Sequence, residues 1–116
     1  MLAASNRLRS RRDIARVFQR GRFGADGPVS VKAGPNRLNY SRAVVVVSKK
    51  VSKKAVVRNR IRRRVAAVMA AEWATVTPGY DIVVTLRDDV TAAATPELAR
   101  RVVSALQRVH VYDKKP

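Results

Sequence analysis

The sequence has no cysteine and only one histidine. Without cysteine the chain forms no disulfide bond, and it has neither a thiol nucleophile nor a thiolate metal ligand. The histidine, His110, is expected in the last turn of a C-terminal helix, where it would interact with the helix dipole. The lack of cysteine and the single histidine argue against catalysis by either kind of side chain. The lack of cysteine also fits a protein made for a reducing cytoplasm.

Acidic residues are scarce, with 8 Asp and Glu against 25 Lys and Arg, so the formal net charge is +17. A two-metal nuclease needs several carboxylates that converge on one cleft. The adjacent pair Asp88 and Asp89 is better explained as an exposed turn, and Asp81 is expected to face solvent or to pair with an arginine. We therefore predict no catalytic residue and no metal site in the protein itself.

Long apolar runs are also absent: the longest, Val65–Ala71, is far shorter than the about 20 residues of a membrane helix. The N-terminal stretch MLAASNRLRSRRD lacks the apolar core of a secretory signal. It is rich in arginine, as an organellar transit peptide would be, but it continues directly into a predicted helix. We predict a cytoplasmic protein that does not bind membranes.

What the sequence does contain is enough apolar residues, 47%, to form a core. We predict a single domain over residues 1–116, with an ordered core of about residues 5–110. The pattern indicates an α+β fold in the order helix, three strands, helix, strand, helix, with helices packed on a central, mostly antiparallel sheet. The expected helices are Ser10–Gly21, Ala55–Trp73 and residues 95 to about 110, and the clearest expected strands are residues 28–33, 42–48 and 80–87.

Several local details follow from the same pattern. Ser10 is expected as an N-cap that forms a capping box with Asp13, and Gly21 as a left-handed residue at the helix end. Residues 21–27, GRFGADG, are expected to form a flexible connection, and residues 28–33 a half-exposed strand. The valine run at residues 44–47 predicts a central strand that is covered on both faces.

The segment Lys53–Val68, KKAVVRNRIRRRVAAV, combines basic residues with a helical apolar stripe that contains Ile61 and Val65. No acidic residue lies between Lys49 and Ala71, whereas a merely solvated helix face usually mixes both signs of charge. Arginine suits phosphate oxygens because its guanidinium donates hydrogen bonds in a planar fork. A nucleic acid is therefore the expected partner, and a DNA-binding helix in a major groove remains an alternative.

Five features together resemble those of the bacterial ribonuclease P protein subunit. They are NRL at residues 6–8, F-x-x-G at residues 18–21, a valine-rich strand directly before SKK at residues 48–50, AVVRNRIRRR at residues 55–64 with its RNR core, and YDIVV at residues 80–84. The resemblance covers about residues 5–110. It also implies the rare left-handed crossover between two parallel strands, which the residue pattern does not show.

The resemblance implies an accessory subunit of an RNA-based endoribonuclease. In this family a catalytic RNA subunit holds the magnesium ions and removes the 5′ leader of precursor tRNA, leaving a 5′-phosphate on the mature end. The implied partners are ribonuclease P RNA and precursor tRNA, and no protein oligomer is required. Alternatives are a ribosomal protein, a general RNA-binding chaperone, or a protein-only nuclease.

The resemblance also implies two groups of binding residues. The catalytic RNA would be bound by Lys49, Lys50, Lys53, Lys54, Arg58, Asn59, Arg60, Arg62 and Arg63. The leader would lie in a cleft formed by Ile14, Phe18, Val29, Val31 and Arg62. Phe18 offers a stacking surface for a base, whereas Ile14, which stands where the family more often has phenylalanine, offers only apolar contact.

Overall fold

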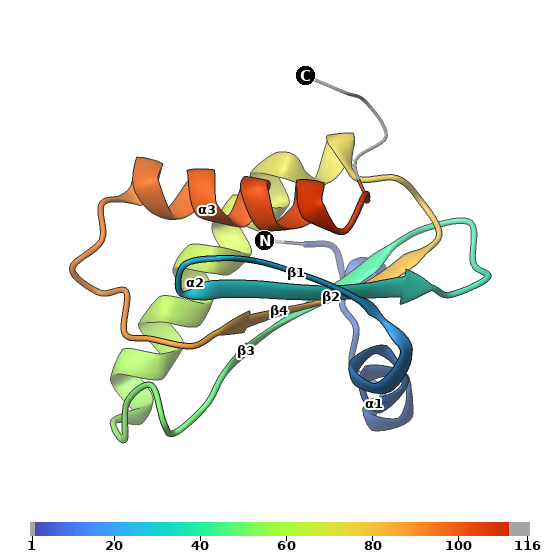
Figure 1. Ribbon diagram of the computed structural model, residues 1–116. Coiled ribbons are helices and arrows are strands. Elements are labelled where there is room, and N and C mark those ends of the chain that lie inside the picture. The colour runs from blue at the N-terminus through green and yellow to red at the C-terminus, as the bar shows by residue number, and fades with distance from the viewer. Residues whose placement is uncertain (1, 112–116) are drawn as a thin grey trace.

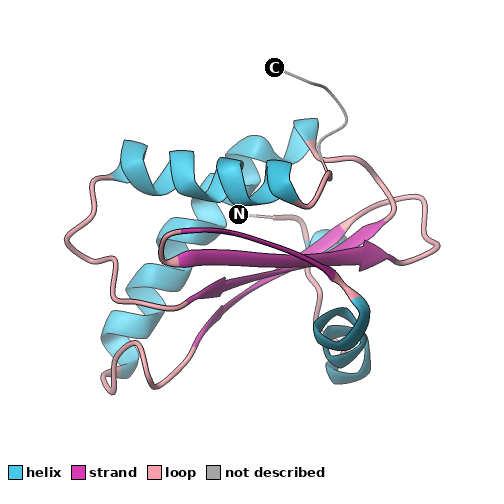
Figure 2. Ribbon diagram, viewed as in Figure 1, coloured by secondary structure: helices cyan, strands magenta, loops and turns pink. Residues whose placement is uncertain are grey.

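The computed structural model describes residues 2–111, so residue 1 and residues 112–116 of the predicted domain lie outside the described residues. Three α-helices and four strands follow the predicted order (Figure 1; Figure 2). The elements are η1 Ala4–Asn6, α1 Arg11–Arg20, β1 Arg22–Asp26, β2 Val29–Pro35, β3 Arg42–Val47, α2 Ala55–Glu72, η2 Trp73–Thr75, β4 Tyr80–Leu86 and α3 Thr95–Arg108. The predicted α+β class is confirmed.

The strands form one mixed sheet in the order β1-β2-β4-β3. The pairings of β1 with β2 and of β2 with β4 are antiparallel, whereas β3 and β4 are parallel and are joined through α2. The predicted central position of the valine run is wrong, because β3 is an edge strand. Its free edge is partly covered by the N-terminal segment, where the Leu8 amide donates to the Ala43 carbonyl at 2.9 Å.

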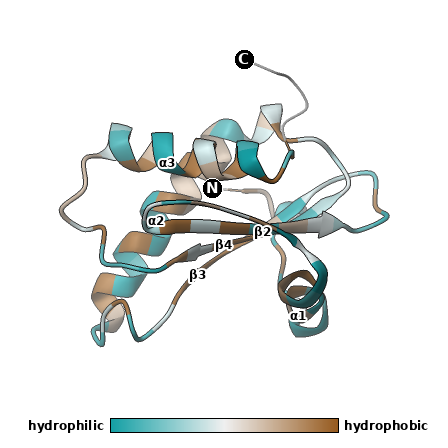
Figure 3. Cartoon of the chain, in the orientation of Figure 1, coloured by the Kyte–Doolittle hydropathy of each residue, from teal (hydrophilic) through white to brown (hydrophobic). Residues whose placement is uncertain are grey.

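The two faces of the sheet carry different layers: α2 and α3 cover one face, and α1 crosses one end of the other (Figure 1). Along β2, Val29, Val31 and Ala33 point into the core beneath α2 and α3, and Figure 3 shows hydrophobic residues along this strand. Ser30 and Lys32 point to the α1 face. The predicted half-exposed strand is wrong at Ser30, which is buried and donates to the Thr85 carbonyl at 3.3 Å.

α1 begins as predicted but ends differently. The Ser10 hydroxyl accepts the Asp13 amide at 3.3 Å, whereas the Asp13 carboxylate pairs with arginines instead of closing the capping box. Gly21 is extended, with φ −69° and ψ 151°, and not left-handed. The chain passes directly from α1 into β1, and a Cβ at this position would collide with the Val17 carbonyl.

The residues expected to form a flexible connection instead form β1, which pairs with β2 over five residues. Gly27, at φ 59°, provides the left-handed residue that the tight turn between the two strands needs. Gly24 lies directly under α3, where a Cβ would come within 2.8 Å of the Arg108 Cβ. β1 was missed because RFGAD lacks the apolar alternation that identifies a strand.

The predicted C-terminal helix is present as α3, and Leu98, Val102, Leu106 and Val109 bury one side of it and its end in the core. The N-cap of α3 is Ala94, which makes no side-chain capping bond. Because no side chain caps the helix, the residue that favours its start here is Pro96, whose fixed φ suits the first turn. His110 lies just beyond α3 with φ 59°, so it is outside the helix turn in which it was expected.

A buried carboxylate, that of Asp81 at the start of β4, connects α1 with three segments of the sheet. Asp81 accepts two hydrogen bonds from Arg42 of β3, at 2.8 and 2.7 Å. Arg16 of α1 lies 3.4 Å away, and the Asn36 amide donates at 3.0 Å from the loop after β2. The predicted pairing with arginine is confirmed, but Asp81 is fully buried and does not face solvent. The hydrogen bond to Asp81 raises the pKa of the Arg42 guanidinium.

Replacement of Asp81 by alanine should destabilise the protein by about 3–5 kcal/mol, because it leaves Arg42 without its buried partner. Urea denaturation followed by circular dichroism measures this change. Asp88→Ala is the matched control, because Asp88 is exposed, and it should change stability by less than about 0.5 kcal/mol. A loss below about 1 kcal/mol for Asp81→Ala would contradict the structural role assigned to this cluster.

A second carboxylate, that of Asp26, fastens β1 to α3. Arg101 of α3 donates to Asp26 at 2.8 Å. Hydrogen bonds from Ser104 and then from Arg101, together with the positive charge of Arg101, lower the pKa of Asp26. A lowered pKa in the folded state means that the ionised carboxylate stabilises the fold.

The stabilisation by Asp26 should therefore be present above about pH 4, the usual pKa of an aspartate in an unfolded chain, and should disappear as the pH falls through its lower folded-state value. Asp26→Asn should lower the Tm at neutral pH and have a vanishing effect in acid. Thermal unfolding of both proteins across this pH range tests the prediction. A Tm difference that does not change with pH would show that the charge of Asp26 is not involved.

Candidate nucleic-acid interface

The exposed side of α2 carries the basic residues that sequence reasoning singled out. Ile61, Val65, Val68 and Met69 bury one side of the helix against the sheet and α3. Asn59, Arg60 and Arg63 are exposed on other sides of the same helix, and Lys49, Lys50, Lys53 and Lys54 are exposed in the loop that precedes it. The fold thus brings the predicted RNA-binding residues together on the loop and the first half of α2.

The charge of this surface is not neutralised within the part of the chain that the structure describes. The ion pairs formed there use the carboxylates of Asp13, Asp26, Asp81 and Glu97, and none of these pairs includes a residue of the α2 surface. Repulsion between close arginines on one helix costs a few tenths of a kcal/mol per pair. An external polyanion such as nucleic acid would remove this cost.

Two of the predicted residues also have roles inside the protein. The half-buried Arg58 donates to the Ser52 carbonyl at 2.9 Å and so holds the lysine-rich loop against α2. Arg62 donates to the Asn59 side-chain oxygen. Arg64 differs from its neighbours, because it donates to the carbonyls of Val90 and Ala93, at 2.9 and 2.6 Å, and anchors the loop before α3. Arg64 is therefore a structural residue.

A second surface lies on the face of the sheet that α1 only partly covers. Phe18 is 40% exposed on this surface. Ile14 packs against Val17 and Val83, between α1 and the sheet. The Lys32 ammonium of β2 lies 5.9 Å from the centroid of the Phe18 ring and donates to the Phe18 carbonyl. An exposed aromatic ring beside a cation is suited to a nucleobase and its phosphate.

Two of the residues predicted for this cleft are placed elsewhere by the structure. Val29 and Val31 are 0% and 1% exposed, and they point to the opposite face, into the core with α2 and α3. The prediction failed because alternation along a strand does not show which face is open. The β2 residues on the α1 face are Ser30 and Lys32, and Val44 and Val46 of β3 are half-buried beside Val83 on the same face. Phe23 of β1, 56% exposed and paired with Lys32, was also missed.

Arg62 lies at the junction of the two surfaces. It lines a groove of about 230 Å³ between the N-terminal segment and α2, together with Leu8, Arg9, Val44 and Ala66. A strand of nucleic acid in this groove would contact both the sheet edge and α2. The position of Arg62 is therefore compatible with either of its predicted roles.

Other candidates for chemistry stand apart from these surfaces. Asp88 and Asp89 are exposed in a turn, as predicted, and hydrogen bonds from Thr91 lower the pKa of Asp89. Within residues 2–111, no three His, Asp or Glu side chains gather as a metal site would require. In the same part of the chain, no helix combines the length and apolarity needed to cross a membrane.

Comparison with known proteins identifies the family. The family model for ribonuclease P matches residues 2–110. The ribonuclease P protein component of a Roseiflexus species is 40% identical over 106 residues, which cover 90% of this chain and 86% of that protein. The RNase P protein of Thermotoga maritima, solved with a fluorophenyl thiourea, has a TM-score of 0.81 at 29% identity over 90% of this chain and all, 100%, of that one. A Staphylococcus aureus RNase P protein shares the fold, with a TM-score of 0.82 at 23% identity over 93% of this chain and 98% of that one.

These matches span nearly the whole chain and favour the ribonuclease P reading over a ribosomal protein or a general RNA chaperone. They agree with the motifs at residues 48–50 and 55–64, which the structure places on the exposed basic surface. The chain belongs to the ribonuclease P protein family.

Proposed function

We propose that this protein acts in the cytoplasm as the accessory subunit of ribonuclease P, binding the catalytic RNA on its α2 surface and the 5′ leader of precursor tRNA between α1 and the sheet. The observation that carries the proposal is the basic side of α2, whose charge has no acidic partner among the described residues. Phosphates of a folded RNA supply the missing negative charge.

The catalytic RNA would dock on the loop at residues 48–54 and on α2. The loop offers four exposed lysines, and Arg58 keeps it in place through the Ser52 carbonyl. Arg60 and Arg63 are free to form bidentate contacts with phosphates, because neither has a partner among the described residues. The buried side of α2, with Ile61 and Val65, holds this surface rigidly on the sheet.

The leader would lie on the open sheet face. Phe18 provides a stacking surface, Lys32 a cation beside it, and Val44 and Val46 an apolar floor. Ile14 packs against the cluster of Leu8, Val17 and Val83, and it offers apolar contact in place of a second aromatic ring. Such a site holds a single strand without reading its sequence, because every base has a face that can stack.

The protein's contribution to catalysis is positioning. The described residues do not form a group of carboxylates and imidazoles that fits magnesium, so the ions that activate water would be held by the RNA. By holding the leader next to the catalytic RNA, the protein makes binding of precursor tRNA partly intramolecular, which raises the effective concentration of the cleavage site.

Leader release from precursor tRNA at low magnesium concentration tests the proposal. The reaction contains a bacterial ribonuclease P RNA with and without this protein, and a further reaction contains the protein alone. Strong stimulation that requires the RNA is expected. Cleavage by the protein alone, or RNA binding without stimulation of the cognate RNA, would contradict the accessory role.

Arg60→Ala should weaken binding of the protein to the catalytic RNA and lower the slope of log K against log salt by about one, because one phosphate contact is lost. Filter binding across a salt series measures both quantities. Arg100→Ala is the control, since Arg100 is an exposed arginine of α3, outside the loop and the helix that form the α2 surface, and its ion pair is with Glu97 of its own helix. An unchanged slope for Arg60→Ala would remove this side chain from the interface.

Phe18→Ala should weaken binding of the holoenzyme to precursor tRNA by about 1–3 kcal/mol, the usual contribution of one stacked base, while the affinity for mature tRNA stays the same. Competition binding with the two RNAs measures the difference. Phe18→Leu keeps an apolar side chain without the ring. If stacking supplies most of the binding free energy at this site, the leucine variant should lose as much affinity as the alanine variant. Equal losses for precursor and mature tRNA would show that Phe18 does not contact the leader.

A further inference from the structure

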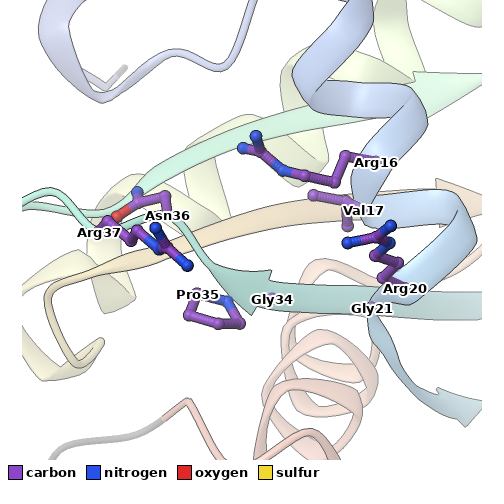
Figure 4. A pocket seen from close by; sticks show the side chains of 8 residues that line it. All are labelled: Arg16, Val17, Arg20, Gly21, Gly34, Pro35, Asn36 and Arg37. Carbon is purple, nitrogen blue, oxygen red and sulfur yellow. The ribbon is translucent and has the colours of Figure 1, made fainter.

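A pocket of about 470 Å³ lies between α1 and the segment that follows β2, and the proposed function does not use it. Its walls carry Arg16 and Arg20 from α1 and Arg37 from the loop, and its floor includes Gly21 and Gly34, which have no side chain to fill the space. Figure 4 shows the three guanidinium groups extending from α1 and from the loop toward the space between them. A pocket with three cationic walls and no acidic lining residue is suited to an anion.

The pocket is on the other flank of α1 from the proposed leader site. At 3.6 residues per turn, Val17 points to the sheet, Phe18 projects to one flank, and Arg16 and Arg20 project to the opposite one. The structure agrees, because Phe18 lies over Lys32 whereas Arg16 and Arg20 line the pocket. One short helix thus separates two surfaces that could each bind RNA.

Two of the three arginines have no partner within the described part of the chain. Arg16 is shared between Asp13 at 3.2 Å and Asp81 at 3.4 Å, so its charge is largely balanced. Arg20 and Arg37 take part in none of the ion pairs or side-chain hydrogen bonds formed by residues 2–111. Each can therefore offer all its donors to a ligand.

The backbone of Arg37 gives a second, independent indication. Its φ is 63°, in the left-handed region that long side chains rarely adopt. Asn36 holds the loop in this conformation: its side-chain oxygen accepts the Leu38 amide at 2.8 Å, and its amide group donates to the Tyr40 carbonyl and to Asp81 at 3.1 and 3.0 Å. Glycine or asparagine would suit this position better, so the structure keeps an arginine at a conformational cost, as is typical of functional sites.

The position of the pocket indicates which RNA would reach it. α1 and α2 lie toward opposite ends of the sheet, and no contact joins them in the described residues (Figure 1). An RNA docked on α2 is therefore remote from the pocket, whereas a strand that stacks on Phe18 has only to continue around a helix about 10 Å across. The distal part of the leader is the nearest source of phosphate.

We propose that Arg20 and Arg37, with Arg16 beside them, bind a backbone phosphate of the leader beyond the nucleotides that contact Phe18. The inference rests on the proposed function, because it requires the leader to lie between α1 and the sheet. It assigns to the protein a contact that depends on leader length. Precursor tRNAs with long leaders would be favoured over those with short ones, without any reading of base sequence.

The test uses the holoenzyme assembled from catalytic RNA and full-length protein, and a double variant, Arg20→Gln with Arg37→Asn. Asparagine removes the charge of Arg37 but tolerates its left-handed backbone, so the loop should keep its shape. Binding is measured for precursor tRNAs with leaders of about ten and about two nucleotides. Arg100→Gln is the control, because Arg100 is exposed on α3, on the other face of the sheet, and its ion pair is with Glu97 of the same helix.

The double variant should bind the long-leader substrate about tenfold more weakly at about 0.1 M salt, with a salt slope lower by about 0.7 because one single-strand phosphate contact is lost, and should bind the short-leader substrate like the wild type. The control variant should match the wild type on both substrates. Unchanged affinity for the long leader would overturn the proposal, and so would equal losses on both substrates, which would place the pocket against the catalytic RNA or the tRNA body. With either of these two outcomes, the wild-type protein would still strengthen binding of precursor tRNA by the catalytic RNA. If the proposed function itself were wrong, the wild-type protein would not strengthen this binding.

Discussion

The arrangement of this protein depends on one buried carboxylate. Asp81 lies at the start of the central strand β4, is fully buried, and receives hydrogen bonds from β3, from α1 and from the loop after β2. A buried charge is tolerated only when it is paired and hydrogen-bonded. The carboxylate therefore requires Arg42, Arg16 and Asn36 to be near one another, and this fixes where α1 crosses the sheet. Both the open sheet face beside Phe18 and the pocket on the other flank of α1 follow from that position.

The same fold keeps two cationic surfaces apart. α2 buries its apolar stripe against β3 and α3, so its arginines face away from the core. α1 lies on the opposite face of the sheet and leaves Val44 and Val46 half-buried next to it. Because the helices are separated by a rigid sheet, one RNA can occupy the α2 surface while another strand lies along α1. An accessory subunit that must contact a catalytic RNA and its substrate together needs this separation.

The sequence was sufficient to predict the elements that have a clear hydrophobic periodicity, and to predict the basic surface. The stripe from Ile61 to Met69 located α2, and the absence of acidic residues between Lys49 and Ala71 identified its exposed side. It was not sufficient where tertiary pairing decides the structure. β1 has no apolar alternation and forms because β2 and α3 offer partners, and the four valines of β3 gave no sign that it is an edge strand.

Only some of the residues predicted for the leader cleft lie together in the fold, for a related reason. Phe18 and Ile14 lie where the family resemblance placed them, on the side of α1 next to the sheet. Val29 and Val31 point to the other face, because the choice of face depends on which side α2 and α3 cover. The pocket at Arg20 and Arg37 could not be foreseen from the sequence, since it needs the fold to bring residues of α1 to the end of β2 and needs the left-handed backbone of Arg37.

The central claim, that α2 faces the catalytic RNA while α1 faces the leader, can be tested directly because the chain has no cysteine. A cysteine introduced at the exposed position Arg63 or Ala15 would carry a hydroxyl-radical-generating iron chelate in the holoenzyme bound to precursor tRNA. The account predicts that the probe on Arg63→Cys cleaves the catalytic RNA and that the probe on Ala15→Cys cleaves the leader. Cleavage of the same RNA segment by both probes, or cleavage of the leader only from α2, would contradict it.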